Sequence, residues 1–210
     1  MTLTDICPDI YVINLLRRTD RFEKVAAQAK KFGFPFVVTC AVDAKEIQNP
    51  TRLRGGEHAL LLSYAKVINW AKSRNLDKVI IFEDDFELVE GFNYRLSEFS
   101  YIPDDWDLIY LGGNNSHLGA GWKNPEKINT FVNRLYSTYC AHSVLIKNTM
   151  YDHILDGISK FNKPLDVVYC DLQQKYNVYG FSKTMCRQYD SESDIIGFNP
   201  EYNKKGIFDD

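Results

Sequence analysis

The 210-residue sequence predicts one α/β domain, built on an open, mainly parallel, Rossmann-like sheet flanked by helices. Short apolar runs of strand length alternate with longer segments whose apolar residues recur every three or four positions. The first three segments follow the order strand, helix, strand, which is the elementary unit of a parallel sheet. With 45% hydrophobic residues, a chain of this length can bury one full core, so residues 1–210 are expected to form one domain.

The first unit begins with a short apolar run at 10–15, which predicts a buried strand. A helix is expected next, because Asp20 and Glu23 make a capping-box pattern and apolar residues follow at helical spacing. Gly33 is expected to end this helix. Residues 36–40 are rich in Val, Phe and Thr and predict a second strand.

The rest of the chain continues the alternation. A Gly- and Asn-rich stretch at 114–125 predicts a long loop. Further helices are expected at 57–72, 151–158 and 165–176, and further strands at 79–82, 108–111 and 143–146. An open sheet of this kind is expected to bind its ligand beyond the carboxyl ends of its strands.

Composition and charge exclude several classes of function. The net charge is −3 without a block of like charges, so a nucleic-acid partner is not expected. No apolar run approaches the roughly 18 residues that a membrane helix needs. The five widely spaced cysteines form no CxxC pair, which is typical of buried free thiols in a reducing compartment. We therefore expect a cytoplasmic protein without a membrane span, and the polar ending leaves open whether it is one domain of a longer chain.

Three adjacent carboxylates, Glu83, Asp84 and Asp85, follow the most apolar of the predicted strands. Such a group is repulsive unless a cation or solvent compensates it. Hard divalent cations take carboxylate oxygens, and Mg²⁺ adds substrate phosphates to one or two of them. Glu83 and Asp85 point the same way on an extended chain. The triplet therefore indicates a metal site, and the alternative is a solvated acidic turn.

Arg17, Arg18 and Arg21 lie at the junction between the first strand and the first helix. Backbone N–H groups and guanidinium groups can both meet an anion there. The segment has no GxGxxG loop, so it lacks a dinucleotide fingerprint. The alternative is a helix start with surface ion pairs.

Several motifs, taken in order, resemble the family-25 lipooligosaccharide and collagen-modifying glycosyltransferases. They are INLLRRTDR, AVDAKEI, GGEHALLLSY, IIFEDDFEL, DWDLIYLGG, YCAHSVLIKN, Pro164-Leu165-Asp166 and RQYDSESDI. The resemblance runs over about 10–195. The chain departs from the family pattern at Ala44, where the family has Gly, and at Tyr64, where it has His after a Ser.

The resemblance implies a GT-A fold, a nucleotide-sugar donor such as a UDP-sugar, a divalent metal (Mn²⁺ or Mg²⁺), and transfer with inversion to a hydroxyl of a glycan or glycoprotein. The nucleotide-binding half is expected at roughly 1–113 and the acceptor-side half at roughly 114–210. The resemblance assigns the nucleotide to Asn14, Leu15, Arg17, Arg21 and Asp43, and the acidic metal motif to Glu83, Asp84 and Asp85. It makes Asp85 the first candidate for a direct metal ligand, with Asp190 as a further ligand, and Asp166 or Asp171 the general base.

Two other functions remain open at this point. A non-catalytic carbohydrate- or nucleotide-binding module is favoured by the altered Ser63-Tyr64 site. A nucleotidyltransferase also pairs acids with a metal on an α/β sheet, but it would release pyrophosphate, whereas a glycosyltransferase releases a nucleoside diphosphate.

Overall fold

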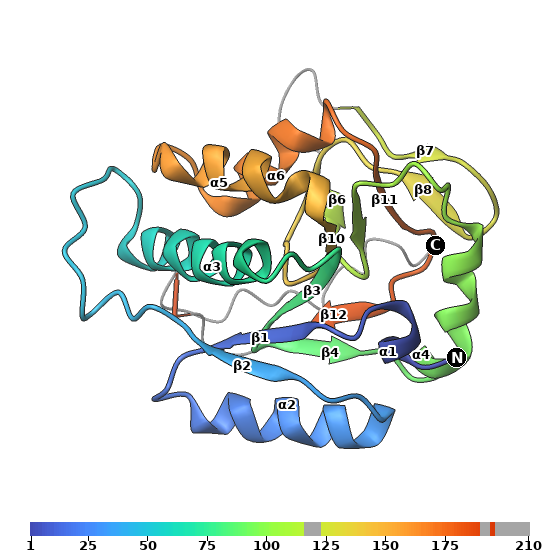
Figure 1. The fold of residues 1–210 in the computed structure, drawn as a ribbon, viewed down its shortest axis with the longest axis horizontal. Helices are drawn as coiled ribbons and strands as arrows, with labels where there is room; N and C mark the ends of the chain where they lie inside the picture. Colours follow the sequence, from blue (N-terminus) through green and yellow to red (C-terminus); the bar gives the residue numbers. More distant parts are fainter. Residues whose placement is uncertain (116–122, 190–193, 196–210) are drawn as a thin grey trace.

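An eight-stranded sheet runs through the middle of the molecule, with helices on both of its faces (Figure 1). The structure is a computed structural model that describes residues 1–115, 123–189 and 194–195. The strands of this sheet are β1 (Ile10–Asn14), β2 (Val37–Cys40), β3 (Lys78–Glu83), β5 (Leu108–Tyr110), β7 (Glu126–Lys127), β8 (Val132–Arg134), β10 (Ser143–Lys147) and β11 (Val178–Phe181). Their spatial order is β2-β1-β3-β10-β5-β11-β8-β7.

The sheet is mainly parallel in direction: six of its eight strands run the same way, and the two reversed strands are β10, near the centre, and β8, beside the edge strand β7. β1 pairs in parallel with both β2 and β3, and β11 pairs in parallel with β5. β10 lies antiparallel between β3 and β5, so these two strands keep the same direction as β1. The predicted α/β fold with an open, mainly parallel sheet is confirmed, and β10 and β8 add two reversed strands.

Helices cover both faces of the sheet (Figure 1). One face carries α3 (Gly55–Ser73), α5 (Tyr151–Ser159) and α6 (Leu165–Gln173), and the other carries α1 (Leu3–Ile6), α2 (Thr19–Phe32) and α4 (Phe92–Arg95). The remaining elements are the 3₁₀ helices η1 (Leu96–Tyr101) and η2 (Asn148–Met150) and the strand pairs β4 (Phe86–Leu88) with β12 (Cys186–Gln188) and β6 (Asn114–Asn115) with β9 (Thr138–Tyr139).

Strand residues alternate between two hydrophobic cores. Tyr11 and Ile13 of β1 pack in the core beneath α3, α5 and α6, whereas Ile10 and Val12 pack in the core beneath α2. Every residue of β1 is buried. Strands covered on both faces lose the polar alternation of a half-exposed strand, which is why this segment is an uninterrupted apolar run in the sequence.

Each predicted strand and helix is present, with ends shifted by a few residues. The predicted capping box of α2 is wrong, because the N-cap is Arg18 and Asp20 instead pairs with the Arg18 side chain. Gly33 ends α2 as predicted, with a φ of 76°. Most of the expected loop at 114–125 lies outside the described residues, although Asn114–Asn115 form β6.

All five cysteines are free, and three of them are buried. Cys40 is exposed and Cys140 is half-buried, so the prediction of buried thiols is wrong for these two. In the part of the chain that the structure describes, no helix is both long and apolar enough to cross a membrane.

Candidate active site

The candidate site lies where β1, β2 and β3 end. These strands are adjacent and parallel, with Ile13 opposite Glu83 and Asn14 opposite Cys40. The residues that follow each strand therefore meet at one edge of the sheet. Asn14 joins two of these ends, because its side-chain amide donates a 2.7 Å hydrogen bond to Asp84.

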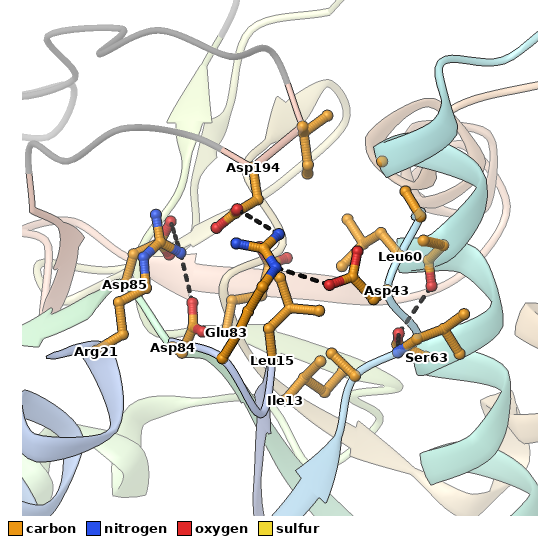
Figure 2. A pocket seen from close by; sticks show the side chains of 17 residues that line it. Ile13, Leu15, Arg21, Asp43, Leu60, Ser63, Glu83, Asp84, Asp85 and Asp194 are labelled. Atoms are coloured by element: carbon orange, nitrogen blue, oxygen red, sulfur yellow. Dashed lines mark hydrogen bonds and ion pairs between the residues drawn. The ribbon is translucent and has the colours of Figure 1, made fainter. Parts of the chain in front are cut away.

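A cavity opens at this edge of the sheet (Figure 2). We call it the first cavity. Its walls come from the ends of the three strands, the start of α3, and Asp194 with Ile195. Seven of the predicted site residues line it together: Leu15, Arg17, Arg21, Asp43, Glu83, Asp84 and Asp85. The separate sequence motifs that carry these residues thus form one site.

Asp84 serves as an anchor within the acidic triplet. Its carboxylate accepts the bond from Asn14 and lies 2.5 Å from Nη1 of Arg21, a side chain that is itself buried. Burial raises the pKa of Asp84, and the nearby Arg21 guanidinium opposes that rise. Arg21 therefore neutralises a buried carboxylate, and both side chains hold the start of α2 against the end of β3.

Glu83 and Asp85 are the two members of the triplet that remain for a cation. The Asp85 carboxylate has long side-chain contacts, at 3.3 Å from Nε2 of Gln188 and 3.4 Å from Nη1 of Arg21. Burial raises the pKa of both carboxyl groups, and the charge of Asp85 raises that of Glu83 further. A nearby cation would favour the charged forms of both.

The donor set fits a cation that also binds phosphate. Within residues 1–115, 123–189 and 194–195, no three His, Cys, Asp or Glu side chains form a group that could hold a metal ion by themselves. Two carboxylates suit Mg²⁺ or Mn²⁺, because such ions complete their shell with phosphate oxygens and water. Glu83 and Asp85 are the residues that would hold the ion.

Arg17 connects the ends of β1 and β2. Its Nε lies 2.7 Å from Oδ2 of Asp43, and its Nη2 lies 2.7 Å from Oδ1 of Asp194. The hydrogen bonds to Asp43 and then Asp194 raise the pKa of Arg17. The pKa of Asp43 is lowered by the backbone N–H of Lys45 and then by Arg17. The Arg17 side chain lines the first cavity and is 39% exposed, so it is accessible to a ligand there.

A second cavity adjoins the first and contains Asp166. The two cavities share Leu60, Glu83 and Ile195 in their walls. Burial raises the pKa of Asp166, and the backbone N–H groups of Ala141 and Cys140 oppose the rise. Oδ1 of Asp166 accepts a 3.1 Å hydrogen bond from the N–H of Ala141. Asp166 and Glu83 therefore line the same second cavity, and Glu83 lines the first cavity as well.

Tyr64, the residue that departs from the family pattern, contacts two residues that line the second cavity, Ala141 and Glu83. Its side chain is fully buried. The hydroxyl donates a 2.7 Å hydrogen bond to the carbonyl of Ala141 and lies 3.3 Å from Oε1 of Glu83. The N–H of Ala141 also donates to Asp166. Ala141 therefore connects Asp166 to Tyr64, the residue that contacts Glu83.

The structure separates the two candidates for the general base. Asp171 lines neither cavity; it is exposed and lies 2.6 Å from Nζ of Lys163. Asp166 alone of the pair faces the site. The proposed further ligand Asp190 lies outside the described residues.

Several residues of the site carry no isolated sequence signal. Asp194 contacts Arg17 and Arg18, and in the sequence it stands out only as part of the final family-like motif, RQYDSESDI. Gln188 reaches Asp85 because β12 pairs with β4, which follows the acidic triplet. Pairing of two three-residue strands leaves no periodic pattern in the sequence that could have revealed this contact.

The comparisons with known proteins agree with the family resemblance that the motifs indicate. Residues 7–168 match the family model described as "Glycosyltransferase family 25 (LPS biosynthesis protein)". Procollagen galactosyltransferase 1 of Danio rerio is 26% identical, over 65% of this chain and 26% of its own length. A putative glycosyltransferase of Haemophilus influenzae is 27% identical, over 75% of this chain and 59% of its own. The Homo sapiens protein named inactive glycosyltransferase 25 family member 3 is 29% identical, over 57% of this chain and 23% of its own.

Similar solved structures have low identity. A glycosyltransferase involved in glycosylation of the major capsid of PBCV-1 aligns with a TM-score of 0.43 and 11% identity, covering 74% of this chain and 66% of its own. The glycosyltransferase GlyE of Streptococcus pneumoniae TIGR4 aligns with a TM-score of 0.41 and 12% identity, covering 84% of this chain and 40% of its own. These values are too low to carry an argument, so a closer kinship with the glycosyltransferase domain of a chlorovirus capsid-glycosylation protein, which we also predict from the motifs, stays a prediction.

The chain spans about a quarter of the collagen-modifying relative and about three-fifths of the bacterial one. The family model nevertheless covers most of this sequence, from the segment before β1 to the first turn of α6. On that evidence, the chain belongs to glycosyltransferase family 25.

Proposed function

We propose that the chain is a metal-dependent, inverting glycosyltransferase that moves a sugar from a UDP-sugar to a hydroxyl of a glycan or glycoprotein. The observation that carries this proposal is the pair of adjoining cavities with Glu83 in their common wall. One cavity has the cationic and acidic groups suited to a nucleoside diphosphate, and the other presents Asp166. A sugar held between them would face both.

The donor fits the first cavity by charge and position. Arg17 lies at the end of β1, where its guanidinium can meet phosphate oxygens. Glu83 and Asp85 line the same cavity, where they would hold Mg²⁺ or Mn²⁺. Such an ion supplies charge stabilisation for the departing nucleoside diphosphate, which becomes more negative as the sugar–phosphate bond breaks.

Asp166 is positioned for the acceptor. A sugar hydroxyl has a high pKa, so a carboxylate should take its proton during attack. A single base on the side away from the leaving group is sufficient for inversion. Asp166 lies in the second cavity, whereas the proposed phosphate contacts are in the first, and this separation supports a single displacement.

Titration calorimetry with UDP, with and without Mg²⁺ or Mn²⁺, tests the donor site. Arg17→Ala should weaken UDP binding while leaving the melting temperature nearly unchanged, because Arg17 is 39% exposed. Arg21→Ala is the matched contrast: it removes the partner of buried Asp84 and should lower the melting temperature. If Arg17→Ala lowers the melting temperature steeply and the folded fraction binds UDP normally, Arg17 is a structural residue and the donor-site assignment is wrong.

The acceptor and the chemistry are tested by turnover with a panel of UDP-sugars and neutral glycosides. Release of UDP with transfer supports the proposal, and NMR of the product anomer tests inversion. Release of pyrophosphate from a nucleoside triphosphate would instead identify a nucleotidyltransferase. The free thiols support the proposal of a cytoplasmic location, because disulfides are rare in that compartment.

A non-catalytic nucleotide-sugar or carbohydrate-binding module is the second candidate. Tyr64 at the altered position favours it, as does the likeness to a human relative whose name calls it inactive. Metal-dependent UDP binding without any turnover across the panel would support the module. Hydrolysis of a UDP-sugar that requires metal would exclude it.

A further inference from the structure

Two arginines at the start of α2 share a carboxylate from the opposite end of the chain. Oδ1 of Asp194 lies 2.7 Å from Nη2 of Arg17, and Oδ2 is hydrogen-bonded to Nη1 of Arg18. The two oxygens of one anion therefore contact two guanidinium groups. Guanidinium groups recognise carboxylate and phosphate oxygens with the same fork of donors, so this pair also fits a diphosphate.

The position of Asp194 is set by close backbone packing. A Cβ built on Gly56, at the start of α3, would lie 2.7 Å from the Cα of Ile195 and 3.1 Å from the carbonyl oxygen of Asp194. Only a glycine permits this approach without movement. Both residues thus lie against the start of α3, and both line the first cavity. Asp194, which Figure 2 labels, also contacts the two arginines.

The cavity is small for the ligand that we assign to it. Its volume is about 90 Å³, and sites for small molecules and cofactors usually have roughly 300–1,000 Å³. Asp194 and Ile195 form part of its wall at the place where Arg17 would meet a phosphate. Displacing these two residues would enlarge the cavity and release the guanidinium donors that now contact Asp194, while Arg17 keeps its pair with Asp43 and Arg18 keeps its pair with Asp20.

We infer that Arg17 and Arg18 together form the binding site for the donor diphosphate, and that Asp194 is an internal anion that competes for it. This inference rests on the proposed function, because it concerns the regulation of the same donor site. A diphosphate carries more negative charge than one carboxylate, so it can displace Asp194 from two partly exposed ion pairs. The apparent affinity for UDP is reduced by the fraction of molecules in which Asp194 occupies the pair.

Calorimetry with UDP, inorganic pyrophosphate and uridine tests the competition, with and without Mg²⁺. Asp194→Asn and Asp194→Ala should each bind UDP and pyrophosphate roughly 3- to 10-fold more tightly, the range expected when two partly exposed ion pairs no longer compete. Affinity for uridine, which has no phosphate, should be the same in all variants.

Asp156→Asn is the matched control for charge. Asp156 pairs with Lys160 at 2.7 Å, is 70% exposed, and neither lines the cavity nor contacts the two arginines. Its loss should leave UDP affinity unchanged. If Asp156→Asn tightens binding as much as Asp194→Asn does, the effect is one of net charge and the inference is wrong.

The remaining outcomes also decide the question. Unchanged UDP affinity in the Asp194 variants would overturn the competition. Weaker binding that depends on Mg²⁺ would make Asp194 a metal ligand and overturn it as well. If UDP binding requires Arg17 but does not respond to Asp194, only this inference fails; if UDP binds neither the natural chain nor any Asp194 variant, the proposed function fails with it.

Discussion

The hydroxyl of Tyr64 bridges the carbonyl of Ala141, at 2.7 Å, and Oε1 of Glu83, at 3.3 Å. Tyr64 is fully buried, so this hydroxyl has no solvent alternative. Its bond to Glu83 opposes the rise in pKa that burial imposes on that carboxyl group. The side chain thus helps Glu83 to carry the charge that a cation site requires.

Tyr64→Phe should weaken both the fold and the cation site. It leaves the Ala141 carbonyl and Glu83 without this donor, which costs about 1–3 kcal/mol of the free energy of unfolding. The pKa of Glu83 should rise further, so Mg²⁺-dependent UDP binding should shift to higher pH. Urea denaturation and calorimetry across a pH series measure the two effects.

Tyr169→Phe provides the matched control. The Tyr169 ring lies 6.2 Å from that of Tyr64, and its buried hydroxyl has no hydrogen-bond partner among the described residues. Removing that hydroxyl should not lower stability or shift the pH dependence of UDP binding. An equal shift in both variants would show that packing, and not the Tyr64 hydroxyl, governs the response.

The sequence predicts the parts of the fold whose signal is periodic. β1 and β3 are apolar because both faces of the sheet are covered, and α2 and α3 repeat their apolar residues at helical spacing. β11 is not among the predicted strands, because a strand of four residues has no usable period. The direction of β10 was not predictable either, because an apolar run is the same whether a strand runs parallel or antiparallel.

The candidate site could be predicted only in part for a similar reason. Residues that follow parallel strands meet at one edge, so the proximity of Arg17, Asp43 and Glu83 follows from strand order alone. Asp166 approaches Glu83 through Ala141, just before the reversed strand β10, and that contact depends on tertiary packing. No local pattern encodes it.

Asp85→Asn should remove the metal dependence of UDP binding. The substitution keeps the shape of the side chain and removes the charge that would hold a cation. Calorimetry should show UDP affinity that no longer improves when Mg²⁺ or Mn²⁺ is added. Unchanged, strongly metal-dependent affinity in this variant would exclude Asp85 as a ligand.

Asp84→Asn is the informative contrast at the neighbouring position. Asp84 already engages Asn14 and Arg21, so its neutralisation leaves a buried guanidinium without its charged partner. We expect a loss of roughly 3 kcal/mol in the free energy of unfolding, with metal-dependent UDP binding retained by the folded protein. If Asp84→Asn instead removes the metal dependence of UDP binding and Asp85→Asn lowers the free energy of unfolding, the roles of Asp84 and Asp85 are exchanged.

His142 should make the protein less stable in acid. Burial lowers the pKa of His142 from 6.5 to about 4 in the folded state. Protonation therefore favours the unfolded chain, and the stabilising contribution is fully present above pH 6.5 and is lost as pH falls towards 4. Relative to His142→Gln, the natural protein should lose about 3 kcal/mol across that window in urea denaturation. A constant difference between the two proteins would show that His142 does not titrate in this range.

Asp166→Asn should abolish most of the transfer while leaving donor binding intact. Asp166 lies in the second cavity, outside the walls of the first, so UDP affinity should be unchanged. Asn retains a carbonyl oxygen that can accept the bond from Ala141, which protects the fold. The turnover should fall by the roughly 10²- to 10⁴-fold expected when a general base is lost.

Two further measurements separate a base from a structural acid at this position. Asp166 also lies in the first turn of α6, where a carboxylate interacts favourably with the helix dipole. If its role is only structural, Asp166→Asn should lower the melting temperature and keep near-normal turnover. A base must be deprotonated to act, and since burial raises the pKa of Asp166, turnover should rise with pH through that raised value. Asp171→Asn, five positions on and exposed beside Lys163, is the matched control and should retain its turnover and pH profile. Near-normal transfer by Asp166→Asn together with a loss in Asp171→Asn would move the base to Asp171 and contradict the cavity assignment.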